Sequence, residues 1–322
     1  MTDERQRARP RHRRLRKVVL VLVVLLVLLT AGSLVFNAVT SGRRTPPAGL
    51  RFVQAGDVRT RYLEWGSSGS PVVLVHGFVE SSGTWRAVGE RLAARGHRVY
   101  ALDLDGWGYS QRVAPYDAAH QAAQVLAFIN ALHLHRPVLV GHSSGAAIVA
   151  LAALRQPSVV GGVMFLDGDA LATGAGAKSP LRHLLIDPFR TTLLRLALGS
   201  DGLIRKVYTS ACGATCPRLD ARGVDEWRRP LQVAGAEPGL WAMADEGVPG
   251  VPIPRLERLR RLPFPKRVVF GGADDTFAKD SPFITARRIG APRPTVISGA
   301  AHLTPVNSPD LVARAVDRLA SH

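Results

Sequence analysis

The chain has 322 residues, 46% of them hydrophobic, and a formal net charge of +17. This length accommodates one large α/β domain with an insertion, and apolar residues are plentiful enough to form its core. The charge does not indicate nucleic-acid binding, because much of it lies in residues 1–44 and no basic stripe with interleaved aromatic residues follows them.

The N-terminus has the pattern of a membrane anchor. Eight basic residues precede an apolar run over residues 18–39, which has the roughly 20-residue length needed to cross a bilayer. We predict a basic cytoplasmic segment (1–17), a transmembrane signal anchor (18–39) and a linker (40–50). The positive-inside tendency then places the rest of this single-pass cell-membrane protein outside the cytoplasm. The alternative is a cleaved signal peptide that ends near Ala31–Ser33, but the apolar run continues beyond this site.

Strands and helices alternate beyond the linker. Short apolar or alternating runs predict strands at 51–54, 58–65, 71–75, 99–102, 137–140, 162–166, 266–270 and 294–297. Amphipathic or small apolar patterns predict helices at 84–95, 117–134, 144–155, 281–289 and 309–320. This alternation predicts an α/β fold with a doubly wound, mostly parallel sheet.

The alternation stops in the middle of the chain. Between residues 168 and 265, helical stretches mix with Gly/Pro-rich turns, and no strand pattern of comparable quality occurs. We predict a helical cap (168–265) inserted between two parts of the core, 51–167 and 266–322. Leucines between 184 and 198 suit either an apolar roof over a substrate or the cap's own core.

The chain has two cysteines, Cys212 and Cys216. In an outward-facing domain such a pair favours a local disulfide, which would shape a loop more than stabilise the fold. A zinc site would need two further ligands, and none stands out nearby. His133 and His135 lack acidic or sulfur neighbours in sequence, and we interpret them as solvated. We expect no metal and no cofactor.

The strongest motif lies where a predicted strand meets a predicted helix. Residues 141–145 read Gly-His-Ser-Ser-Gly, with an apolar run before them and small helix-forming residues after them. Glycines two residues either side of Ser143 permit a sharp turn that presents its hydroxyl, and the first N–H groups of the helix favour a developing oxyanion. The pattern predicts a nucleophile. The alternative is a plain turn in which Ser143 caps the helix.

Five motifs, in this order, resemble the α/β-hydrolase superfamily in its cap-bearing, esterase- and lipase-like serine hydrolase branch. They are His76-Gly77-Phe78, the D-x-x-G-x-G-x-S loop at 103–110, the G-x-S-x-G motif at 141–145, the G-x-x-D loop at 272–275 and the G-x-x-H loop at 299–302. The resemblance covers residue 51 to the C-terminus and implies the superfamily's open sheet and catalytic triad.

Serine chemistry needs a base and an acid. A serine hydroxyl is a poor nucleophile at neutral pH, so a histidine must take its proton and a carboxylate must hold that imidazole in the right tautomer. The resemblance implies Ser143 as the nucleophile and His302 as the general base. A helix-capping or surface role is the alternative for His302.

Two neighbouring aspartates compete for the acid. Counting three residues from Gly272 selects Asp275, which we prefer, whereas counting from Gly271 selects Asp274. Asp167, which follows the preceding strand, is a displaced alternative.

The resemblance also implies an oxyanion hole formed by the backbone N–H groups of Phe78 and Ser144. We interpret His76 and the Asp103–Gly108 loop as organisers of this region. The superfamily usually has proline where Asp105 stands, so the rim of the site differs here in charge.

The leading hypothesis is a membrane-anchored serine hydrolase that cleaves a carboxylic ester through an acyl-enzyme. An apolar small molecule such as a lipid ester is the expected substrate, and a thioester or an amide is the less favoured alternative. Serine at the elbow disfavours epoxide hydrolysis and haloalkane dehalogenation, which use an aspartate nucleophile in this superfamily. Hydrolysis of a carbon–carbon bond and cofactor-free perhydrolysis use serine and stay open. A catalytically weak ligand-binding or receptor protein is the alternative of a different class.

Overall fold

The computed structural model describes residues 9–171 and 186–321. Positions 184 and 185 of the predicted apolar roof lie outside this range. The contacts divide the chain into two units, one with residues 1–42 and 178–200 and the other with residues 43–177 and 201–322.

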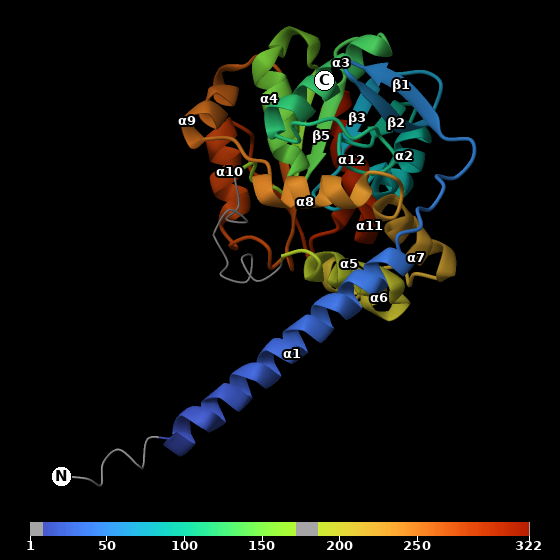
Figure 1. Cartoon of the computed structure of the whole chain (residues 1–322). Helices are drawn as coiled ribbons and strands as arrows, with labels where there is room; N and C mark the ends of the chain where they lie inside the picture. Colours follow the sequence, from blue (N-terminus) through green and yellow to red (C-terminus); the bar gives the residue numbers. More distant parts are fainter. Residues whose placement is uncertain (1–8, 172–185, 322) are drawn as a thin grey trace, which may run out of the picture. The chain divides into compact units, whose positions relative to one another are not determined.

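The larger unit contains an eight-stranded sheet with the order β1-β2-β4-β3-β5-β6-β7-β8 (Figure 1). Strands β4, β3, β5, β6, β7 and β8 run parallel, whereas β2 is antiparallel to both β1 and β4. The predicted α/β class with a mostly parallel sheet is confirmed. The strands are β1 (Arg51–Ala55), β2 (Val58–Trp65), β3 (Pro71–Val75), β4 (Arg98–Leu102), β5 (Val138–His142), β6 (Gly162–Leu166), β7 (Lys266–Gly271) and β8 (Thr295–Ile297).

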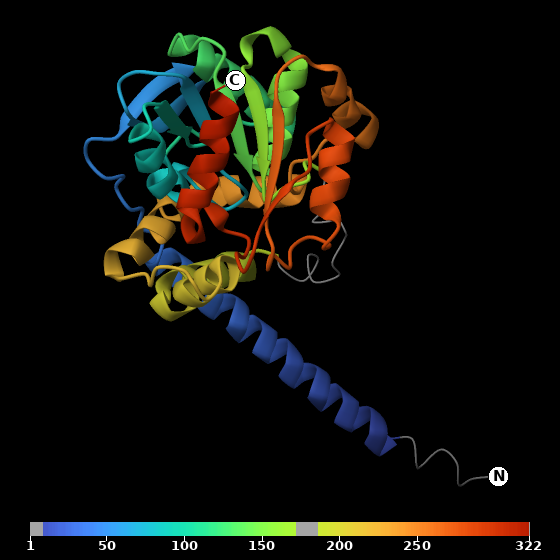
Figure 2. The same cartoon turned by 180° about the vertical axis from the view of Figure 1, so that it is seen from behind.

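Helices cover both faces of this sheet. On one face, α3 (Ala118–Ala131), α4 (Gly145–Arg155) and α10 (Ser281–Ile289) share a core with the strand side chains that point toward them. On the other face, α2 (Arg86–Ala93) and α12 (Pro309–Ala320) do the same. Figure 1 is viewed from the side of α3 and α4, and Figure 2 from the side of α12.

Local sequence explains where elements begin. Asp117 caps α3, because its side chain accepts a hydrogen bond from the His120 N–H at 2.8 Å. The β1–β2 hairpin closes around Gly56 and Asp57, and Gly56 adopts the positive φ of 66° that such a tight turn requires. A short 3₁₀ helix, η1 (Ser82–Trp85), replaces the first turn of the predicted helix ahead of α2.

The chain between β6 and β7 is helical in its described part, and no strand occurs in its residues 168–171 or 186–265. The elements in the larger unit are α6 (Asp201–Cys212), α7 (Ala221–Arg228), η5 (Arg229–Leu231), α8 (Ala236–Glu246), α9 (Ile253–Leu256) and η6 (Glu257–Arg261). Near the end of the sheet, α11 (Thr304–Asn307) precedes α12. Tyr208 and Cys212 of α6 pack on Leu303 in a small core of their own.

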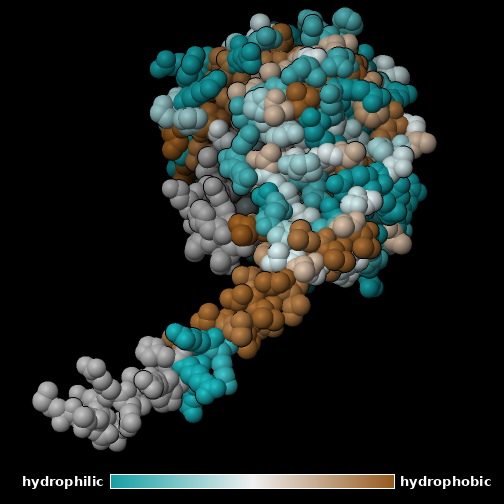
Figure 3. All heavy atoms as spheres, viewed as in Figure 1, coloured by the Kyte–Doolittle hydropathy of each residue, from teal (hydrophilic) through white to brown (hydrophobic). Residues whose placement is uncertain are grey.

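The smaller unit consists of α1 (Arg9–Val39) and α5 (Phe189–Gly199). Within α1, the stretch Arg13–Val39 is long and apolar enough to cross a membrane. Figure 3 shows this helix with a hydrophilic N-terminal turn followed by a hydrophobic surface. Side chains near the end of α1 contact α5 through hydrogen bonds.

Candidate active site

Ser143 lies in a strained turn between β5 and α4. Its φ of 51° is in the left-handed region, and its N–H donates to the Leu166 carbonyl at 2.8 Å. A Cβ on Gly141 would lie 2.3 Å from the Gly145 carbonyl oxygen, so this turn leaves no room for a side chain there. The glycines of the motif therefore allow the strand to turn sharply and present Ser143.

His302 connects Ser143 to a carboxylate. Its Nε2 lies 3.0 Å from Ser143 Oγ, and its Nδ1 lies 2.8 Å from Asp274 Oδ2. Burial alone would raise the pKa of Asp274, but the hydrogen bond and charge of His302 outweigh burial and hold that pKa below its usual value. An ionised Asp274 accepts the Nδ1 proton of His302 and leaves Nε2 free to accept from the serine hydroxyl.

The structure corrects the predicted acid from Asp275 to Asp274. Asp275 is exposed, whereas the Asp274 side chain is almost fully enclosed at 1% exposure and meets His302. The other Asp274 oxygen, Oδ1, accepts the Thr276 N–H at 2.9 Å, which is the hydrogen bond of an Asx turn. This turn aims Asp274 inward. Because any non-proline residue supplies such an N–H, the sequence carries no signal that separates the two neighbouring aspartates.

Asp167, the displaced alternative, has other partners. Its Oδ1 accepts the Gly271 N–H at 2.7 Å, and its Oδ2 accepts from the Thr304 hydroxyl. Asp167 thus joins the ends of β6 and β7 to the start of α11, two residues after His302. It supports the loop that carries His302.

The backbone beside Ser143 offers two N–H donors. A Cβ on Gly77 would lie 2.9 Å from the Ser143 Cβ, so the lack of a side chain lets the loop that carries Phe78 reach the serine. In the described part of the chain, the N–H groups of Phe78 and Ser144 have no hydrogen-bond acceptor. Both amides are therefore available to a ligand.

His76 organises this loop from below. Its Nδ1–H donates to the Gly77 carbonyl at 2.7 Å, and its Nε2 accepts the Leu104 N–H at 3.0 Å. Burial lowers the pKa of His76, which keeps the imidazole neutral in this tautomer. Asp103 contributes from the same side, because its Oδ1 accepts the Ser82 N–H at 2.7 Å.

A second imidazole, which sequence reasoning did not single out, lies directly beneath the site. His142 Nδ1 is 2.8 Å from Glu80 Oε1, and its Nε2 donates to the main-chain carbonyl of His302 at 2.9 Å. Burial alone would lower the pKa of His142, but the charge of Glu80, its hydrogen bond to His142 and the nearby carboxylate of Asp167 raise this pKa well above its usual value. His142 is thus a buried cation that holds the backbone of His302.

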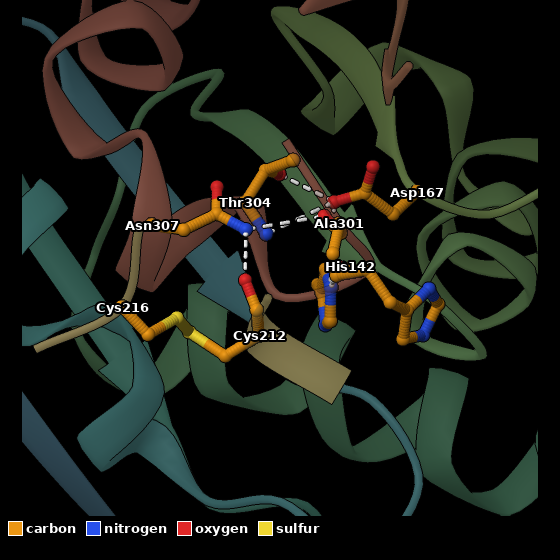
Figure 4. Close-up of a disulfide and its surroundings, with 8 residues drawn as sticks. His142, Asp167, Cys212, Cys216, Ala301, Thr304 and Asn307 are labelled. Carbon is orange, nitrogen blue, oxygen red and sulfur yellow. Dashed lines mark hydrogen bonds and ion pairs between the residues drawn. A yellow bond between two sulfur atoms is a disulfide. The ribbon is translucent and has the colours of Figure 1, made fainter. Parts of the chain in front are cut away.

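Cys212 and Cys216 form a disulfide at the end of α6 (Figure 4). Asn307 connects it to the loop of His302, since its side-chain amide donates to the Cys212 carbonyl at 2.8 Å and to the Ala301 carbonyl at 3.2 Å. Figure 4 shows Asn307 between the disulfide and Ala301, with Thr304 and Asp167 behind them. The disulfide therefore braces this loop from the side of α6.

Aromatic rings flank the reactive atoms. Phe78 packs edge-on against Trp107 with ring centroids 4.9 Å apart, and the ring centroid of Phe277 lies 6.0 Å from that of His302.

The two histidines that the sequence analysis interpreted as solvated, His133 and His135, are exposed. Across the described ranges, no group of three or more histidine, cysteine or acidic side chains is arranged to hold a metal ion.

Known proteins share this fold and sequence. The family described as alpha/beta hydrolase fold matches residues 70–211. A 2-hydroxy-6-oxo-6-(2'-aminophenyl)hexa-2,4-dienoic acid hydrolase from Metapseudomonas resinovorans is 31% identical over 238 residues, which cover 70% of this chain and 74% of that protein. The chain belongs to the α/β-hydrolase family.

Other similarities are more limited in extent or identity. Epoxide hydrolase A of Mycobacterium tuberculosis is 37% identical over 125 residues, so the chain spans 39% of the length of that relative. The crystal structure of a serine hydrolase involved in carbazole degradation has a TM-score of 0.69 at 22% identity, and the match covers 84% of this chain and 98% of that one. The curated relatives include epoxide hydrolases, carbon–carbon bond hydrolases and a non-heme haloperoxidase of Rhodococcus erythropolis, and the hydrolases among them support a hydrolase here.

Proposed function

We propose that this protein is a membrane-anchored serine hydrolase that cleaves a carboxylic ester through an acyl-enzyme. One observation carries the proposal: hydrogen bonds of 2.8 Å and 3.0 Å connect Asp274 through His302 to the Ser143 hydroxyl. Nucleophile, base and orienting carboxylate in this geometry define the serine triad irrespective of fold.

In the first half-reaction, Ser143 Oγ attacks the ester carbonyl carbon while its proton moves to His302 Nε2. Asp274 stabilises the imidazolium that forms, and the N–H groups of Phe78 and Ser144 stabilise the oxyanion. The tetrahedral intermediate collapses when the alcohol oxygen leaves with the proton from His302. Water then attacks the acyl-serine in the same way, and it releases the carboxylic acid and restores Ser143.

Residue chemistry favours acyl transfer over epoxide opening. A serine stands at position 143, where the superfamily's epoxide hydrolases use an aspartate, so similarity to epoxide hydrolases does not extend to the nucleophile. The aromatic rings of Phe78, Trp107 and Phe277 suit an apolar acyl or alcohol group.

Hydrolysis of a carbon–carbon bond is the second candidate. It is favoured by the 31% identical relative, which is named a hydrolase of a 2-hydroxy-6-oxo-dienoic acid and matches 70% of this chain. The same serine and oxyanion donors serve either reaction. A receptor or ligand-binding protein that turns over little is the remaining alternative.

The membrane part of the proposal depends on α1. Its stretch Arg13–Val39 has the length and composition of a bilayer-spanning helix, and basic residues precede its apolar run. We assign α1 as the anchor, with the hydrolase domain on the extracytoplasmic side.

A fluorophosphonate probe tests the nucleophile in the full chain solubilised in detergent. We expect an adduct on Ser143, none in Ser143→Ala, and strongly slowed labelling in His302→Ala. Peptide mapping identifies the modified residue, and circular dichroism checks that each variant is folded. A folded wild-type chain that forms no adduct would contradict the serine hydrolase proposal and favour ligand binding.

A comparison of substrates distinguishes ester hydrolysis from carbon–carbon bond hydrolysis. p-Nitrophenyl esters of increasing acyl length are compared with a 2-hydroxy-6-oxo-dienoate, with Ser143→Ala as the blank. Ester turnover without dienoate turnover supports the first candidate, and the reverse result supports carbon–carbon bond hydrolysis.

A further inference from the structure

Helix α5 is fastened to the end of α1. The Asn37 side-chain amide donates to the Pro188 carbonyl at 2.9 Å, and the Thr192 hydroxyl donates to Asn37 Oδ1 at 3.0 Å. The hydroxyls of Ser33 and Thr192 are in contact, and the Arg195 guanidinium donates to the Asn37 carbonyl. These contacts involve backbone and side chains of both helices, so α5 has a defined position on α1.

The contacts lie at one boundary of the apolar run. The run over residues 18–39 spans about 33 Å as a helix, which matches the hydrocarbon core of a bilayer. Ser33 and Asn37 occupy its last part, within about 9 Å of Val39 along the helix axis. If α1 spans the bilayer as proposed, its contacts place α5 at the depth where headgroups meet acyl chains.

One face of α5 is apolar, and no described residue covers it. Phe189, Leu193 and Leu196 follow one another at spacings of four and three residues, so they form a stripe along the helix, and Ile186 lies in the segment just before it. Ile186, Leu193 and Leu196 are 57%, 52% and 53% exposed in that order. Leu198 is buried in contrast, and Thr192 and Arg195 are engaged with α1.

A stripe of large exposed aliphatic side chains on one helix marks an interaction surface. We infer that α5 is an interfacial helix that inserts Leu193 and Leu196, together with Ile186 just before the helix, into the outer leaflet of the bilayer. This inference rests on the proposed membrane anchor. Lipid is the expected occupant of the stripe, because α5 is hydrogen-bonded to α1, which we assign to the bilayer. The first described helix of the insertion is therefore part of the membrane attachment.

Depth-dependent quenching tests the inference with the full chain in phosphatidylcholine nanodiscs. Leu193→Cys and Leu196→Cys are labelled with an NBD fluorophore; the native cysteines are paired and do not react. We expect doxyl groups near the headgroup to quench both labels at least about twofold more than a label at Leu311→Cys. Leu311 is the matched control, an exposed leucine on α12 at 44%.

A label at Leu26→Cys, within α1, reports on the anchor itself. If Leu26 is quenched by deep doxyl groups but Leu193 and Leu196 behave like Leu311, the interfacial helix is wrong and the anchor stands. If Leu26 is not quenched, both the anchor and the inference fail. If the labels at Leu193 and Leu196 are shielded from aqueous iodide but are not quenched by doxyl lipids, a protein partner or a second copy of the chain covers the stripe. This result would also overturn the interfacial helix.

Fluorophosphonate labelling of Ser143 in each variant is independent of these outcomes. Equal labelling rates in Leu193→Cys and Leu311→Cys show that the catalytic domain is intact. Failure of the serine hydrolase proposal is thereby distinguished from failure of the lipid contact.

Discussion

Two histidines lie side by side in the site, and each faces a carboxylate. The ring centroids of His142 and His302 are 5.1 Å apart. The Nδ1 of each is 2.8 Å from a carboxylate oxygen, of Glu80 for His142 and of Asp274 for His302. They differ at Nε2, where His302 meets the Ser143 hydroxyl and His142 meets a backbone carbonyl.

Solvent access separates the two pairs further. The His142 side chain is 0% exposed and that of His302 is 16% exposed. Burial would raise the pKa of Glu80, but the charge of His142 lowers it, and the pKa of His142 is raised in turn. The protons of the buried pair of Glu80 and His142 stay in place, whereas the Nε2 of His302 faces a hydroxyl whose proton it can accept. The same two residue types thus form a buried ion pair in the interior and, nearer the surface, the pair that we propose as base and acid of the hydrolase.

The largest expected effect comes from the base. His302→Gln removes the proton acceptor of Ser143, so we expect kcat to fall on the order of 10⁵-fold. The side chain is partly exposed and its replacement is similar in size, so the free energy of unfolding changes by less than about 1 kcal/mol. Ester turnover and urea unfolding measure the two quantities, and turnover close to wild type would remove His302 from the mechanism.

The acid gives the next largest effect. Asp274→Asn keeps the shape of the side chain but removes the charge that orients His302, and we expect about a 10⁴-fold lower kcat. Asp275→Asn is the matched control and should stay within about threefold of wild type. Equal losses in the two variants would show that the acid has been misassigned.

Much of this site follows from local sequence. Ser143 and His76 lie in turns whose glycines and flanking strands are contiguous in the chain, so motif spacing is enough to single them out. The order of strands and helices likewise follows from short-range hydrophobic patterns.

The parts that sequence reasoning missed depend on orientation or on distant pairing. Asp274 and Asp275 are adjacent, and only the Asx turn to Thr276 determines which of them points inward. Glu80 reaches His142 across 62 positions of sequence, and no periodic pattern connects two such residues. Contacts of this kind arise when the sheet brings the strand ends together.

Substitution of Glu80 tests the buried ion pair between Glu80 and His142. Glu80→Gln leaves a buried imidazolium without its counter-charge, which should lower the free energy of unfolding by about 3 kcal/mol. We expect a smaller loss in kcat, about tenfold, because His142 also holds the backbone of His302. Urea unfolding and ester turnover give both values, so Glu80→Gln should show the opposite balance to His302→Gln.

Two variants control this experiment. Glu90→Gln makes the same substitution on an exposed glutamate of α2 and should leave stability unchanged. Glu80→Gln combined with His142→Gln removes both charges, so part of the lost stability should return. A Glu80→Gln chain as stable as Glu90→Gln would show that no ion pair is present.

A third carboxylate–imidazole pair behaves in the opposite way. Asp105 is buried with its Oδ2 3.1 Å from His120 Nδ1, and the Nε2 of His120 lies 3.1 Å from the exposed Asp57. Burial raises the pKa of Asp105 to about 6, against the hydrogen bond from Val113 and the charge of His120. A histidine shared with a second, solvated carboxylate therefore does not hold the pKa of the buried carboxylate at or below its usual value.

This raised pKa predicts the smallest effect and its sign. Below about pH 4 Asp105 is protonated in the folded and in the unfolded chain. Between about pH 4 and 6 only the folded chain keeps this proton, so the free energy of unfolding falls as the pH rises through that window. From pH 5 to pH 8 the loss from Asp105 is about 1 kcal/mol. Asp105→Asn should remove it, which urea unfolding at the two pH values measures. If Asp105→Asn leaves the stability difference between the two pH values unchanged, the pKa of Asp105 is not raised in the folded protein, and Asp105 is ionised across this range as Glu80 is.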